Sequence, residues 1–256
     1  MTPANAWRWC AAAGVAAFLC SWGFGQIPGL VACGPTGGLG PIIAFEFVRS
    51  PAHVAMLFGA EPCRSALVAA QKTGLLLDAL GFIPAYAAFL VFAALACSPA
   101  KAGVQSRAAH SSAPAFAGER IRWLVIGAIL LAALCDQIEG ALLYRILADL
   151  PGPPTLIDAL WWPVHIKFAL LAAGTAGIAI LLLSHMRLPG FVAALFVTIG
   201  VCTAVAGWLN GPSPVMMLGF TISWVTILLS ALLASWRPSL FSARAAPPPV
   251  PAPPSA

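Results

Sequence analysis

Charged residues are scarce in this 256-residue chain: they make up 8% of it, whereas 61% of it is hydrophobic. A soluble domain is usually about 25% charged and about 45–50% apolar, so the composition excludes an ordinary soluble fold. The sequence also lacks a phosphate-binding loop, a zinc-protease motif and a paired Cys-x-x-Cys. Its 13 Lys and Arg residues do not cluster as they would on a nucleic acid-binding face. These features predict a multi-pass α-helical membrane protein.

Apolar runs account for most of the chain. A spanning helix needs about 20 mostly apolar residues, and six runs meet that length. They cover residues 8–32, 74–96, 122–146, 161–183, 189–208 and 215–236. The expected fold class is therefore all-α: a membrane bundle of about six transmembrane helices within residues 1–237, with short interfacial helices on the outer side.

The positions of the basic residues predict the orientation of the bundle. Cytoplasmic connections are enriched in Lys and Arg. If the N-terminus is cytoplasmic, the inner side carries Arg8, Lys101, Arg107, Arg120, Arg122, Arg187, Arg237 and Arg244, and the outer side carries Arg49, Arg64, Lys72 and Arg145. Tryptophans stand at both expected interfaces, as aromatic belts do. We therefore expect both termini in the cytoplasm.

Three segments are expected to lie outside the membrane core. Residues 33–73 form an outer interfacial segment, in which Ser50-Pro51 is a helix start. Residues 98–119 are rich in Ala and Ser and indicate a flexible cytoplasmic loop. Residues 238–256 form a Pro/Ala-rich tail that cannot build a packed core and is expected to be disordered. A ligand motif for a partner domain is an alternative for this tail.

Four charged residues fall inside the expected spans: Asp78, Asp136, Glu139 and Lys167. A charge at the bilayer centre costs about 2.5–3.5 kcal/mol on insertion scales. At about 1.5 Å per helical residue, Asp78, Glu139 and Lys167 all lie about 9 Å below the same outer boundary. Asp136 lies one turn deeper on the face of Glu139. The sequence therefore predicts one shared polar layer.

Other residues are candidate members of this site. Gln26 falls at a similar level of the first span, and Tyr86 follows Asp78 by eight residues. In the outer segment, Glu46 and Arg49 are three apart and are expected to pair on a helix. Together with His53 they are candidates for a lid above the polar layer.

Three functions fit the polar layer. The first is a pocket or proton relay for a small molecule or ion, favoured by the excess of acids over Lys167. The second is a structural ion-paired lock that only orders the bundle, as in an accessory protein or in contact with a membrane partner or second copy. The third is a membrane enzyme acting on a lipid or quinone. This last ranks lowest, because no nucleophile–base motif is present; no catalytic residue, metal or cofactor is predicted.

Two cysteines, Cys33 and Cys63, fall on the expected outer side, where disulfides form. We therefore expect a Cys33–Cys63 bridge that pins the outer segment. The string Leu30-Val-Ala-Cys33 also resembles a lipidation motif, which would make residues 1–32 a cleaved signal. The other five cysteines are expected to pack as small apolar residues.

Several strings carry a resemblance. They are Phe45-Glu-Phe-Val-Arg-Ser-Pro51, Asp78 with Phe82-Ile-Pro-Ala-Tyr86, Asp136-Gln-Ile-Glu139 and Lys167-Phe168. Over about residues 40–183 the chain resembles an uncharacterised family of bacterial multi-pass integral membrane proteins. Gly140 departs from that family's pattern, which has Asn after the Glu. The resemblance implies a bacterial inner-membrane location and no particular activity.

Overall fold

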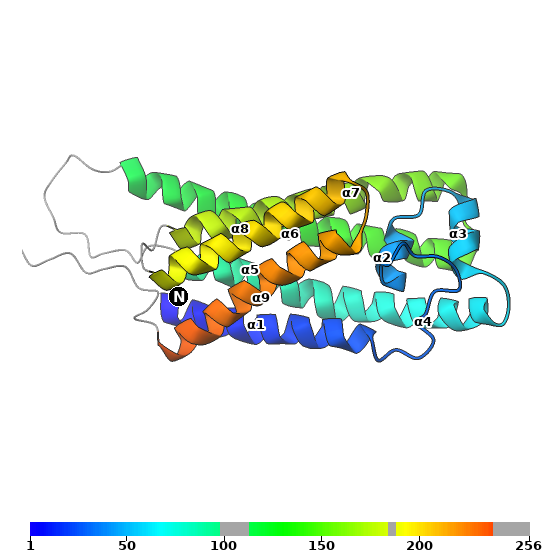
Figure 1. Ribbon diagram of the computed structural model, residues 1–256, viewed down its shortest axis with the longest axis horizontal. Coiled ribbons are helices and arrows are strands. Elements are labelled where there is room, and N and C mark those ends of the chain that lie inside the picture. Colours follow the sequence, from blue (N-terminus) through cyan, green and yellow to red (C-terminus); the bar gives the residue numbers. More distant parts are fainter. Residues whose placement is uncertain (98–112, 184–187, 238–256) are drawn as a thin grey trace, which may run out of the picture.

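The computed structural model describes residues 1–97, 113–183 and 188–237. Within these ranges every regular element is a helix. The elements are α1 (Pro3–Phe24), α2 (Pro41–Glu46), α3 (Pro51–Phe58), α4 (Cys63–Leu77), the π-helical turn η1 (Asp78–Phe82), α5 (Ile83–Ala96), α6 (Ala113–Ala148), α7 (Pro154–Leu183), α8 (Leu188–Leu209) and α9 (Pro214–Trp236). The long helices run along one axis, and α2 and α3 lie at one end of the bundle (Figure 1).

Five of the helices are long and apolar enough to cross a membrane. They are Cys63–Ala96, Gly118–Ala148, Pro154–Leu183, Leu188–Leu209 and Pro214–Trp236. The expectation of an all-helical chain with membrane-spanning helices is thus supported. The first of the six expected spans, 8–32, is not among them. Helix α1 ends at Phe24, and Gly29 has a φ of 77° in the turns that follow.

Helix α1 nevertheless belongs to the bundle, since it packs against α5 and α9. Arg8 lies between two tryptophans in its first half and lowers the apolar character of that half. The other pairs of neighbouring long helices include α5 with α6, α6 with α7, α7 with α8, and α8 with α9. Every long helix therefore has at least one long partner.

Several boundaries differ from the expected ones. Helix α4 continues through η1 into α5, so that residues 63–73 of the outer segment form one continuous helix with the second expected span. Helix α6 begins at Ala113, so residues 113–119 are helical where a loop was expected. Pro114 stands in the first turn of α6, where the missing N–H of proline costs no helical hydrogen bond. Residues 98–112 and the tail 238–256 lie outside the described residues.

The segment between α1 and α4 is fixed to α4 at two points, and its two short helices also pack against each other. Cys33 and Cys63, the pair expected from the sequence, form a disulfide. Gln71 donates a hydrogen bond through Nε2 to the carbonyl oxygen of Pro41 at 2.9 Å. The ring centroids of Phe45 and Phe58 lie 5.0 Å apart, edge to face. These contacts hold α2 over the end of the bundle.

The segment 25–62, which contains α2 and α3, forms an end cap on the bundle. Removal of this disulfide should loosen the end cap. The bridge joins cysteines 30 residues apart, and closing a loop of that size stabilises a protein by about 2–4 kcal/mol. The Cys33→Ser/Cys63→Ser variant should therefore unfold at a lower temperature than the parent in detergent without reductant. Cys202→Ser, at an exposed free cysteine, is the matched control. Equal melting of all three proteins would show that the bridge does not support the cap.

Candidate functional site

The ammonium group of Lys167 lies at the centre of the buried polar groups. Its Nζ atom is 2.9 Å from Oε2 of Glu46, 2.9 Å from Oδ1 of Asp136 and 2.7 Å from Oε2 of Glu139. All four side chains are at most 8% exposed. A protonated lysine has three N–H donors. The three carboxyl groups therefore take up its full donating capacity.

Three helices deliver these groups to one point. Asp136 and Glu139 are three apart on α6 and so share a face of that helix. Lys167 reaches them from α7, which packs along α6. Glu46 is the last residue of α2, and the short helix ends there against the bundle. The site thus joins the end cap to the bundle.

Tyr86 and Asp78 of the π-helical turn join Glu46, Asp136 and Lys167 in one polar wall. The Tyr86 hydroxyl donates to Oδ2 of Asp136 at 2.8 Å. In η1 the Ile83 N–H bonds the Asp78 carbonyl, five residues back. Gln137 on α6 donates through Nε2 to the carbonyl oxygen of Ala79 at 2.8 Å. Single π turns inside α-helices are frequent at functional sites, and this one carries Asp78.

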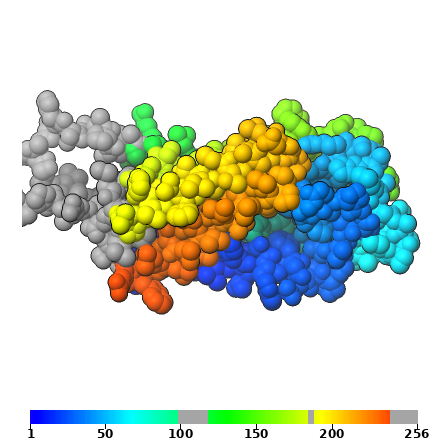
Figure 2. Space-filling view, in the orientation of Figure 1, coloured from blue at the N-terminus to red at the C-terminus, as the bar shows by residue number. Residues whose placement is uncertain are grey.

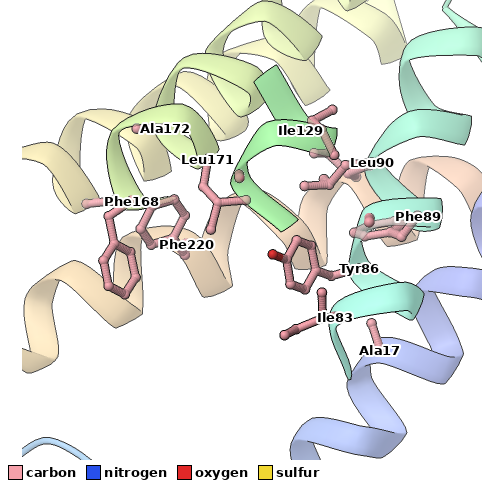
Figure 3. Close-up of a cluster of buried hydrophobic side chains, with 14 of the residues drawn as sticks. Ala17, Ile83, Tyr86, Phe89, Leu90, Ile129, Phe168, Leu171, Ala172 and Phe220 are labelled. Atoms are coloured by element: carbon pink, nitrogen blue, oxygen red, sulfur yellow. The ribbon is translucent and has the colours of Figure 1, made fainter. Parts of the chain in front are cut away.

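A cavity of about 420 Å³ adjoins the polar wall. Glu46, Asp78, Tyr86, Asp136 and Lys167 line it on one side. The other lining residues come mainly from α1, α2, α7 and α9 and are mostly apolar or aromatic. In Figure 3, Tyr86 lies on α5 and faces the side where Leu171 of α7 and Phe220 of α9 project. A hollow on the face shown in Figure 2 lies between α1, α9 and the segment containing α2.

The carboxyl groups outnumber the ammonium group three to one. Glu46 and Glu139 are both ion-pair partners of the Lys167 Nζ atom, through their Oε2 atoms. Burial raises the pKa of Glu46 above its ordinary value, while the nearby Lys167 acts in the opposite direction. Burial therefore favours a proton on the Glu46 carboxyl group, at the end-cap side of the site.

A second polar cluster lies beside the end cap. Nδ1 of His165 is 2.8 Å from the carbonyl oxygen of Trp161 and must donate to it, so that Nε2 accepts from Nη2 of Arg49 at 3.1 Å. The His165 ring stacks on Trp161 with a centroid distance of 4.2 Å. Arg49 and Trp161 also line a small recess of about 190 Å³.

The structure brings together most of the predicted site residues. Asp78, Asp136, Glu139, Lys167 and Tyr86 all lie at the cavity or in the cluster around Lys167. Gln26 does not: it follows the end of α1 and lines a separate small recess with Thr73. The predicted depth therefore applies to the residues on continuous helices and not to Gln26.

The predicted lid has a different arrangement. The expected Glu46–Arg49 pair is wrong, because α2 ends at Glu46 and the two side chains no longer share a helical face. Glu46 binds Lys167 and belongs to the site itself, whereas Arg49 contacts His165. The backbone N–H of His53 donates to the Ser50 hydroxyl at the start of α3, and His53 does not line the cavity.

Two site residues were missed by sequence reasoning. Glu46 was assigned to the lid, although a lone acid in the apolar run Pro41–Val48 is the same signal that identified the other acids. Gln137 stands between Asp136 and Glu139 and was overlooked because an amide carries no charge. Among the described residues, no group of three His, Cys, Asp or Glu side chains is arranged to hold a metal ion.

The comparisons with known proteins assign no family: no protein-family model, no curated protein and no solved structure matches this chain.

Proposed function

We propose that this protein is an integral membrane protein that binds a small molecule in the cavity beside Lys167. The cavity of about 420 Å³ is the observation that carries the proposal. Protein interiors are close-packed, and voids larger than a water molecule are few. An ion-paired lock between α2, α6 and α7 needs no such space next to it. A small-molecule site does, and such sites usually measure about 300–1,000 Å³.

The predicted topology gives this site a direction. With both termini in the cytoplasm of a bacterium, the end of the bundle that carries α2 and α3 faces outward. The ligand then binds in the outer half of the inner membrane. Glu46, whose buried carboxyl group favours a proton, can exchange that proton as the ligand binds, which suits an uptake or sensing protein. The rival function is an accessory protein in which the same groups only order the bundle.

Occupancy of the cavity tests the proposal. Thr221 lines the cavity and is exposed at its edge, so Thr221→Trp should fill the space without touching the ion pairs. Native mass spectrometry of the parent protein, released from mild detergent, should show an adduct of small-molecule mass. Thr221→Trp should lose that adduct. Leu229→Trp is the matched control, since Leu229 lies on the same helix, is 60% exposed and does not line the cavity.

The rival function predicts a different result. If the ion pairs only order the bundle, the parent and Thr221→Trp should carry the same adducts, or none. That outcome would overturn the proposal.

A further inference from the structure

Except for the exposed Ser21 hydroxyl at the edge of the cavity, the side-chain hydrogen-bond donors that line the cavity already have partners. Lys167 gives its three N–H groups to Glu46, Asp136 and Glu139. The Tyr86 hydroxyl donates to Asp136. On α9, the Thr221 hydroxyl donates to the Met217 carbonyl at 2.9 Å, and the Trp224 ring N–H donates to Thr175 at 3.4 Å. To bind at the polar wall, a ligand that needs donors, such as a carboxylate, would have to displace one of these bonds.

Not all carboxyl oxygens that line the cavity have a hydrogen-bond partner. Asp78 lines the cavity, and within the described part of the chain no hydrogen bond or ion pair occupies its carboxyl group. Four acids, Glu46, Asp78, Asp136 and Glu139, stand against one ammonium group in this region. The wall therefore presents more carboxyl groups than the single ammonium group can pair with, and the carboxyl oxygens of Asp78 are free to accept. A positively charged ligand with N–H donors is its chemical complement.

Aromatic rings line the same cavity as these acceptors. The Tyr86 ring centroid lies 5.4 Å from that of Phe82 and 5.5 Å from that of Trp224. Phe168 and Phe220 extend the wall, with their centroids 6.0 Å apart. Faces of Trp, Tyr and Phe rings attract cations, and the same rings accept apolar groups. An ammonium head on an apolar body matches both properties.

The cavity reaches the bundle surface between two long helices. Its lining includes Ser21 of α1 and Thr221 of α9, which are both exposed. Thr221 lies within the candidate span Pro214–Trp236. Figure 2 shows the hollow between these two helices. A ligand can therefore enter sideways from the apolar part of the bilayer.

We infer that the ligand is an amphipathic amine: a primary or secondary ammonium head on an apolar chain, which enters between α1 and α9 and pairs with Asp78. This inference rests on the proposed function of the cavity and adds the chemical class of the ligand.

Binding of radiolabelled dodecylamine to the protein in nanodiscs tests the inference, with empty nanodiscs as the background. The parent protein should show saturable binding at neutral pH, where the amine is protonated. Unlabelled dodecanoate, with the same chain length and opposite charge, should not compete. Asp78→Asn should weaken binding at least tenfold. Asp149→Asn, an equal change at an exposed acid outside the cavity, should leave it unchanged.

The outcomes separate the two proposals. Absence of saturable dodecylamine binding, effective competition by dodecanoate, or unchanged binding in Asp78→Asn would overturn the amine assignment. The proposed function would still stand if the adduct of the parent protein is lost in Thr221→Trp. If Thr221→Trp binds dodecylamine like the parent and also keeps the adduct, the cavity is not the site and both proposals fail.

Discussion

Replacing Lys167 with Met is expected to destabilise the protein by about 3–5 kcal/mol, the cost of breaking a buried ion pair by removing one partner. Three carboxyl groups contact the Lys167 ammonium, and none is more than 8% exposed. Without the ammonium they would repel one another or need further protons. The effect should be among the largest of any single substitution in this chain.

Thermal unfolding in detergent measures this effect. Lys167→Met should unfold well below the parent protein and yield less folded material. Lys72→Met is the matched control. Lys72 is only partly buried, its Nζ lies 5.9 Å from the centre of the Tyr144 ring, and it has no ion pair with any of the described residues. Similar melting of both variants would show that the cluster around Lys167 does not stabilise the bundle.

A rescue experiment separates stability from binding. Adding Asp136→Asn and Glu46→Gln to Lys167→Met removes two of the stranded charges, so much of the lost stability should return. The rescued protein should still lack the normal ligand adduct, because the polar wall of the cavity has changed. A rescued protein that keeps the parent's adduct would argue that these groups serve packing alone.

The polar layer could be predicted because its members sit on regular helices. The rise of about 1.5 Å per residue places Asp78, Glu139 and Lys167 at one depth. In the structure Asp78 and Lys167 line one cavity, and Glu139 pairs with Lys167. The same arithmetic failed for Gln26, since α1 ends at Phe24. It also gave the wrong partner for Glu46, whose helix is six residues long and ends at that residue. Depth is predictable only while the helix continues.

The sequence does indicate the π turn, through a proline and not through the spacing of apolar residues. Pro84 has no N–H and cannot bond the carbonyl of Leu80, and its ring clashes with that carbonyl. The turn η1 lies directly before it and widens the helix at Asp78. The cavity itself could not be predicted. It depends on the distance between α1 and α9 beyond the region where the two helices touch. That separation depends on packing between segments distant in the sequence.

Helices α8 and α9 meet through small residues, and Gly219→Val should separate them. A Cβ atom on Gly219 would lie 2.5 Å from the carbonyl oxygen of Gly200 and 2.6 Å from Cα of Ala204. Both are backbone atoms, so no side chain can move aside. Small residues let membrane helices approach this closely. Since overpacking usually costs about 1–3 kcal/mol and occasionally more, we expect a loss of about 3 kcal/mol, measured by thermal unfolding.

The same substitution should also reduce ligand binding, because Phe220, next to Gly219, lines the cavity. Displacement of α9 from α8 would move that wall. Gly127→Val on α6 is the matched control, since a Cβ atom there meets no atom within 4 Å and should leave both melting and binding unchanged. If Gly219→Val lowers the melting temperature but leaves dodecylamine binding intact, the cavity wall does not depend on the contact between α8 and α9. Loss of both would show that this small-residue contact sets the position of α9 and hence the shape of the site.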